Sequence, residues 1–152
     1  MIQRIQSVYL FLSVVLIVVC ACLPIGMINP VGMGNASEIY NMCIIDGNTG
    51  NVSFSVVGLF ALLAASVITS VINIFNYSDR KKQSRNCLVT IMLLILWVGL
   101  YAFEMYMFNT EDNTFEIRFV AILPVVAIVF QWLARMAIKR DERLIRSIDR
   151  IR

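Results

Sequence analysis

Four long apolar stretches, separated by short charged segments, constrain the fold of this chain more than any other feature. They cover about residues 8–27, 54–75, 87–108 and 118–138. Each is close to the ~20 mostly apolar residues that a helix needs to cross a hydrocarbon core about 30 Å thick. With 59% hydrophobic residues among 152, the chain has no room for a separate soluble domain. We therefore predict a single integral membrane domain over residues 1–152, an all-α four-helix transmembrane bundle.

The basic residues are distributed asymmetrically around these stretches. Twelve of the 13 Lys and Arg residues, all except Arg118, lie in the segments 1–6, 77–86 and 135–152. The intervening loops are mainly acidic. Lys and Arg are retained on the cytoplasmic side of a membrane, whereas acidic residues contribute little to this bias. The pattern therefore predicts that both termini lie in the cytoplasm.

The loop that follows the first stretch has the pattern of a small β-hairpin. Turn-forming residues at 46–50 separate the segments 38–45 and 51–57. Pro24 is expected to kink or end the first helix just before this loop. A cleaved signal peptide, with Cys22 as a lipidated residue, is a minor alternative for the first stretch. Its removal would leave three spans with termini on opposite sides, which the charge pattern contradicts.

Polar residues inside the spans form a second pattern. A stripe on one face of the second span contains Ser66, Thr69, Ser70 and Asn73. Such residues more often form a hydrogen-bonded packing seam between helices than the lining of a water-filled path. Thr90 and Gln131 are the residues of other spans that would contribute to a path on the cytoplasmic half. We favour packing and keep the path as an alternative.

Two ionisable residues form a candidate intramembrane polar site near the outer ends of the third and fourth spans. Glu104 lies about one turn from the end of the third span, and Arg118 opens the fourth. We expect these two residues to form an ion pair at the interface, because Glu104 is shallow. The functional alternative is a carboxylate that binds a cation or carries a proton, since ionisable groups within membranes are functional candidates by default.

The tail at residues 139–152 is basic and amphipathic. Its apolar residues fall on one helical face with arginines around them. We predict an amphipathic cytoplasmic helix that continues the fourth span. Its candidate contacts with a lipid surface or a protein partner are Arg140, Arg143, Leu144, Ile145, Arg146, Ile148, Arg150 and Ile151. These two kinds of partner carry equal weight, and nucleic acid is not expected because the tail lacks aromatic residues and contains acids.

For catalysis, the sequence offers no convergent set of residues. It contains no histidine, no GxSxG motif and no Gly-rich phosphate loop, and its four cysteines lack metal-site spacing. We therefore expect no enzymatic activity, cofactor or metal. The leading hypothesis is a non-enzymatic accessory or scaffold subunit that docks a partner through the tail. The runner-up is a small transporter or channel that acts as a homo-oligomer, with an unknown small-molecule substrate.

Both ends of the chain carry distinctive motifs. Met1–Gln6 (MIQRIQ) runs directly into an apolar helix, and Ile138–Arg152 (IKRDERLIRSIDRIR) closes the chain. With the length and span count, these motifs make the chain resemble domain-of-unknown-function family 4293, small four-helix inner-membrane proteins of Bacteroidota. The resemblance implies a multi-pass protein of the bacterial inner membrane with a periplasmic outer hairpin, and it transfers no catalytic or binding residues. If the first and fourth helices are neighbours, the two motifs lie close together.

Overall fold

The computed structural model describes residues 3–32, 34–76 and 79–149, with the side chains of residues 5–143 within these ranges. As predicted, it contains four helices long and apolar enough to cross a membrane. They are α1 (Gln3–Cys22), α2 (Val57–Phe75), α3 (Arg80–Phe108) and α4 (Leu123–Asp149), which follows the short 3₁₀ helix η1 (Phe119–Ile122). Both α1 and α3 pack against α2 and α4, so the helices form a four-helix bundle.

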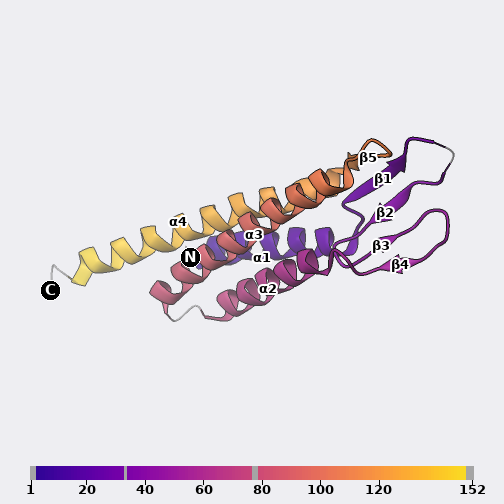
Figure 1. Cartoon of the computed structure of the whole chain (residues 1–152). Coiled ribbons are helices and arrows are strands. Elements are labelled where there is room, and N and C mark those ends of the chain that lie inside the picture. Colours follow the sequence, from indigo (N-terminus) through magenta and orange to yellow (C-terminus); the bar gives the residue numbers. More distant parts are fainter. Residues whose placement is uncertain (1–2, 33, 77–78, 150–152) are drawn as a thin grey trace.

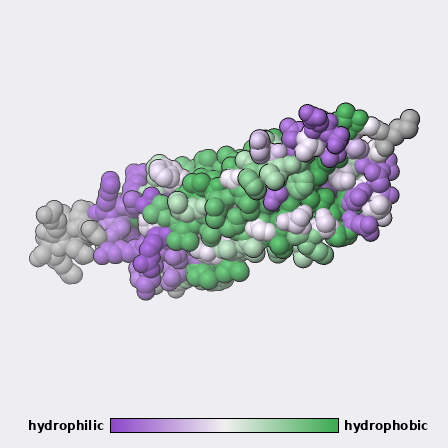
Figure 2. Space-filling view, viewed as in Figure 1, coloured by the Kyte–Doolittle hydropathy of each residue, from purple (hydrophilic) through white to green (hydrophobic). Residues whose placement is uncertain are grey.

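The surface of the bundle is apolar along its middle and polar at both ends (Figure 2). Large apolar side chains such as Phe11, Ile68, Met92 and Val129 are exposed on the four helices. An apolar surface of this extent is unfavourable in water. In hydrocarbon it is the surface that contacts lipid, and helices satisfy their own backbone groups there. The structure thus has the features of a multi-pass membrane protein.

A five-stranded antiparallel sheet covers the end of the bundle opposite the C-terminal end of α4 (Figure 1). In spatial order its strands are β4 (Val52–Ser53), β3 (Ile44–Ile45), β2 (Ser37–Ile39), β1 (Gly26–Pro30) and β5 (Asn113–Ile117). The predicted hairpin is therefore only a part of the observed sheet. Its loop at 46–50 does connect two paired strands, β3 and β4. Its first strand is broken by a turn at residues 40–43, so that β2 pairs with β3.

The first span is shorter than predicted. Helix α1 ends at Cys22, and Gly26 and Met27 already belong to β1. Pro24 cannot donate the hydrogen bond that would continue the helix. Strand β1 then pairs with β2 on one side and, along its whole length, with β5 on the other. This pairing satisfies the backbone of β1 close to the membrane, and it joins the loop between α3 and α4 to the first half of the chain.

Asn41 attaches the sheet to the bundle. Its Nδ2 donates to the carbonyl oxygen of Cys20 at 2.6 Å, and its Oδ1 accepts from Nε1 of Trp97 at 3.0 Å. The Asn41 backbone oxygen also accepts from the backbone N–H of Phe60 at 3.1 Å. Asn41 is fully buried, and so are its partners Cys20 and Trp97. One side chain in the turn between β2 and β3 thus fixes the positions of α1 and α3, while its backbone holds the start of α2.

We expect Asn41→Ala to lower the free energy of unfolding by about 1–3 kcal/mol, because it leaves Trp97 Nε1 and the Cys20 carbonyl without their partner. The measurement is denaturant-induced unfolding in mixed micelles. Asn51→Ala, at an exposed position in the next loop, is the control and should change the unfolding free energy little. Equal stability of the two variants would contradict the role assigned to Asn41.

Candidate functional site

Inside the bundle, polar residues separate two apolar clusters. The larger cluster lies toward the sheet, and its fully buried members include Ile17, Leu59, Leu63, Leu94, Trp97 and Ala127. The smaller cluster lies toward the termini and contains Leu10, Cys87, Ala134 and Ile138. Between them along the chain, the helices α1, α2, α3 and α4 carry the buried polar residues Ser13, Ser70, Thr90 and Gln131. We call these four residues the polar layer.

Gln131 connects three helices within the polar layer. Its Nε2 donates to Ser13 Oγ at 3.0 Å and to Ser70 Oγ at 2.9 Å. Thr90 on α3 donates to the Asn86 carbonyl of its own helix at 3.1 Å. All four residues of the layer have no exposed surface. Hydrogen bonds between membrane helices contribute about 0.6 kcal/mol each on average, and they also fix how the helices are positioned along one another.

The polar stripe predicted on the second span serves mainly to pack α2 against its neighbours. Ser66 and Thr69 each donate to a carbonyl one turn earlier on α2, at 2.8 Å. Ser70 belongs to the polar layer, and Asn73 Nδ2 reaches Cys87 Sγ on α3 at 3.2 Å. The contact between Asn73 and Cys87 shows that these two residues lie at the same depth of the bundle. Ser70 and Thr90 each lie about one turn closer to the sheet than these two, so Thr90 of α3 is at the depth of the polar layer. These interhelical contacts favour the packing interpretation of the stripe.

The two terminal motifs meet at the end of the bundle opposite the sheet, which we call the basic end. Gln6 of the N-terminal motif donates from Nε2 to Oδ2 of Asp141 in the C-terminal motif. Both residues are buried, with exposed fractions of 5% and 6%. They meet because α1 and α4 are packed side by side, as expected for neighbouring first and fourth helices. At the basic end, α1 and α4 are therefore joined by a specific buried hydrogen bond, in addition to the basic residues that surround it.

Beyond Asp141, α4 continues as one helix to Asp149 and extends past the ends of the other helices (Figure 1). Of the predicted contact residues, Arg140 and Arg143 are exposed on this part of α4. Four more lie on its helical backbone but have side chains outside the described part: Leu144, Ile145, Arg146 and Ile148. Arg150 and Ile151 lie outside the described residues. The predicted continuation of the fourth span into a helical tail is present as far as Asp149.

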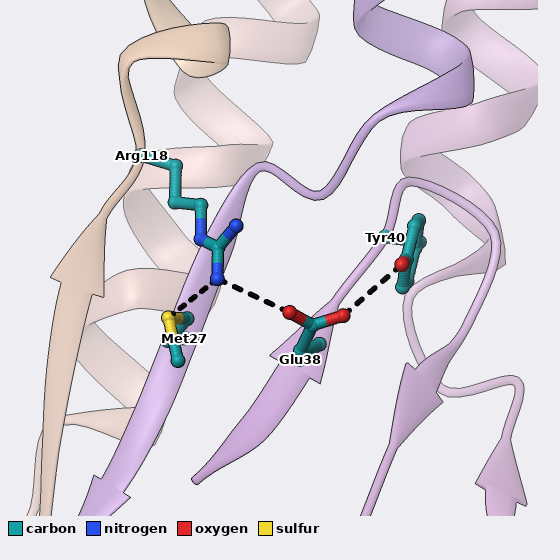
Figure 3. A network of polar contacts seen from close by, with 4 residues as sticks. All are labelled: Met27, Glu38, Tyr40 and Arg118. Atoms are coloured by element: carbon teal, nitrogen blue, oxygen red, sulfur yellow. Dashed lines mark hydrogen bonds and ion pairs between the residues drawn. The ribbon is translucent and has the colours of Figure 1, made fainter.

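Arg118 pairs with Glu38 of the sheet (Figure 3). The predicted pair with Glu104 is wrong. Nη2 of Arg118 lies 3.1 Å from Glu38 Oε1 and 2.8 Å from Met27 Sδ. Glu104 is the partner predicted from the sequence, because the short loop between the third and fourth spans brings it near Arg118. The sheet changes this, because β1 and β2 pair and place Glu38 directly opposite Met27, within reach of Arg118. Glu104 is half-buried on α3 and has no ion pair among the described contacts.

The same carboxylate holds Tyr40. The Tyr40 hydroxyl donates to Glu38 Oε2 at 3.0 Å, so Glu38 accepts from both Tyr40 and Arg118 (Figure 3). The hydrogen bond to Glu38 raises the pKa of Tyr40 above its ordinary value, because loss of the phenolic proton would place a second negative charge beside the carboxylate. Both side chains of the ion pair are more than a third exposed, so the pair itself stabilises the fold by less than about 1 kcal/mol.

Comparison with known proteins identifies a family for this chain. The model of a domain of unknown function, DUF4293, matches residues 2–151, which is essentially the whole chain. No curated protein matches this chain. Within the described residues, no three His, Cys, Asp or Glu side chains are grouped so that they could hold a metal ion. The features that remain as candidates are the polar layer, the buried contact at the basic end and the extension of α4.

We expect Asp141→Leu to lower the free energy of unfolding by about 1–3 kcal/mol, because it leaves the buried amide of Gln6 without its acceptor. Asp141→Asn retains an acceptor and should cost less. Lys139→Ala, at an exposed position on the same helix, is the matched control. Unfolding in mixed micelles measures all three, and equal effects of Asp141→Leu and Lys139→Ala would show that the contact contributes nothing.

We expect the Glu38→Gln variant to ionise Tyr40 at lower pH than the unsubstituted protein. Because the pKa of Tyr40 is raised in the folded state, its contribution to stability is present below about pH 10, the ordinary tyrosine pKa, and is lost as the pH rises through the folded value. Near-ultraviolet absorbance follows tyrosinate formation, and Tyr40→Phe identifies the contribution of this residue. An unchanged Tyr40 titration in Glu38→Gln would be incompatible with this coupling.

Proposed function

The chain belongs to the DUF4293 family, and we propose that it is a non-enzymatic accessory or scaffold subunit of the bacterial inner membrane that docks a protein partner through the extension of α4. In this proposal the bundle anchors the protein in the membrane. The sheet faces the periplasm, the basic end faces the cytoplasm, and the partner binds on the cytoplasmic side. The orientation rests on the distribution of Lys and Arg between the two ends of the molecule.

The observation that carries the proposal is the continuation of α4 beyond Asp141, the last buried residue of this helix whose side chain the structure describes. Asp141 is buried against Gln6, whereas Arg140 and Arg143 beside it are exposed. The helix then continues for eight residues, from Asp141 to Asp149, which corresponds to about 12 Å along its axis. No other helix accompanies this part of α4 in Figure 1. The extension is therefore available to a partner that the chain itself does not provide.

The direction of the extension favours a protein partner over a lipid surface. An amphipathic helix that binds lipid lies in the plane of the interface, with its apolar face in the headgroup region. The extension of α4 instead continues roughly along the axis of the bundle (Figure 1). If the bundle spans the membrane, the extension points away from it. The helical segment with Leu144, Ile145 and Ile148, which the sequence places on one face, then lies in the aqueous phase. A protein surface is the fitting partner for an apolar helix face there.

The second candidate function is a small oligomeric transporter or channel. The polar layer supports it, because all four helices contribute buried polar residues to it. Against it, the larger apolar cluster, with Leu63, Leu94 and Trp97, fills the interior on the sheet side of the layer. A single bundle is therefore closed on that side, and transport would need an assembly of several copies. Under this function Glu104→Gln should reduce activity, whereas a docking subunit should tolerate it.

We expect the full-length protein, purified from native membranes in mild detergent, to carry a stoichiometric partner that is lost on truncation after Arg143. This truncation removes Leu144 to Arg152 but retains the contact between Gln6 and Asp141, so the bundle stays intact. Truncation after Ile138 would remove that contact too and would confuse docking with stability. Mass spectrometry identifies the partner, and size analysis of the complex gives its stoichiometry.

Matched substitutions of apolar and polar residues within the extension sharpen this test. Ile145→Ser together with Ile148→Ser should release the partner, because both residues lie on the apolar face. Ser147→Ala together with Asp149→Asn, on other positions of the same segment, should retain it. A homogeneous homo-oligomer without a partner would contradict docking and favour the transport function. Equal retention of a partner by all variants would show that the extension is not the docking element.

A further inference from the structure

Four buried side-chain atoms have no hydrogen-bond partner in the part of the chain that the structure describes. They are Asn73 Oδ1, Gln131 Oε1, Arg135 Nε and Asp141 Oδ1. Asn73 and Gln131 have no exposed surface, and Asp141 is 6% exposed. Each such group is strongly unfavourable when it is surrounded by hydrocarbon, because no solvent there can replace the missing partner. All four atoms lie between the polar layer and the basic end.

Three of the four atoms belong to α4, at successive depths of the bundle. On α4, Gln131, Arg135 and Asp141 are four and six residues apart, which corresponds to about 6 Å and 9 Å along the helix. Asn73 lies on α2, where its Nδ2 donates to Cys87 Sγ of α3 and its backbone oxygen accepts from Gln83 Nε2 at 3.4 Å. Together the four atoms cover the depth from the basic end to the polar layer.

The chemistry of these atoms selects one class of ligand. Three of them, on Asn73, Gln131 and Asp141, are acceptors, and Arg135 Nε is a donor. A cation would suit the acceptors but not the guanidinium, and an anion would suit the guanidinium but not the acceptors. Water both donates and accepts, so it satisfies all four. Reversing the Gln131 amide does not remove the need, because its nitrogen would then be the atom without a partner.

We propose that a file of ordered water molecules enters the bundle at the basic end, beside Asp141, and ends at Gln131. From Asp141 to Gln131 the file covers about 15 Å along α4, roughly half of the hydrocarbon thickness. The smaller apolar cluster of Leu10, Cys87, Ala134 and Ile138 lies at the same depth, so in this proposal the file passes beside it along Asn73 and Arg135. On the sheet side of Gln131 the large apolar cluster, which includes Ile17 and Leu63, closes the interior. The result is a blind aqueous inlet, in which Gln131 holds its inner end. This inlet is independent of docking by the extension of α4.

Water itself is the probe that tests the inlet. The native thiol of Cys87 touches Asn73 and therefore lies beside the file, so its S–H group should exchange with deuterium when the protein in lipid vesicles is moved into D₂O. The variant for this measurement retains Cys87 and replaces Cys20, Cys22 and Cys43 by Ala. We expect its infrared S–H band to be lost at once.

The matched control is Ile17→Cys in a chain whose four native cysteines are replaced by Ala. Ile17 is fully buried, like Cys87, but it lies in the apolar cluster beyond Gln131. Its S–H band should persist long after that of Cys87 has disappeared. Persistence of the Cys87 band to the same extent would overturn the proposal, and so would immediate loss of both bands.

A second measurement uses the unsubstituted chain, so that a variant that fails to fold does not decide the outcome. Hydroxyl radicals formed by a short X-ray pulse oxidise side chains that lie next to bound water, and mass spectrometry locates the products. We expect oxidation at Cys87 and none at the equally buried Cys20, which lies in the large apolar cluster. Absence of oxidation at Cys87 would contradict the inlet.

Discussion

A polar group within a bundle surrounded by hydrocarbon must be hydrogen-bonded by other groups of the protein or by bound water. The packing of these helices depends on how Gln131 meets that requirement. The Gln131 side chain bonds to Ser13 and Ser70 and thereby connects α4 to α1 and α2. Dispersion contacts between apolar helices have similar energies at many positions of one helix along another. The hydrogen bonds of the polar layer form at only one of these positions, so the polar layer determines how far each helix is shifted along its neighbours.

The two ends of the bundle follow from that central arrangement. Toward the sheet, the aligned helices place Trp97 and the Cys20 carbonyl where Asn41 can bond to both. Toward the termini, the alignment of α1 with α4 brings Gln6 to Asp141. The extension of α4 begins at this second contact, so the proposed docking element has a rigid base. The exposed side chains in the middle of the bundle, in contrast, are apolar and suit contact with lipid.

The helices could be predicted because each is a long apolar stretch, a pattern that requires no knowledge of tertiary contacts. Most of the sheet could not, since β2, β3 and β4 are only two or three residues long and β5 pairs with a strand from the other half of the chain. The stripe on α2 was visible from helical periodicity. Ser13 and Asn41 carried no such signal, because a single polar residue in a span or a loop has no period. For the same reason the partner of Arg118 was predicted wrongly: proximity along the chain favoured Glu104, whereas strand pairing supplies Glu38.

The orientation of the bundle is the claim on which docking depends, and site-specific labelling tests it most directly. Cys43 lies by the sheet, and Arg143→Cys places a thiol at an exposed position of the basic end. Each is used as the single cysteine of the chain and exposed to a membrane-impermeant maleimide. In spheroplasts, our account predicts that Cys43 is labelled and that the Arg143→Cys thiol is labelled only after the membrane is opened. Labelling of the Arg143→Cys thiol in intact spheroplasts would contradict it.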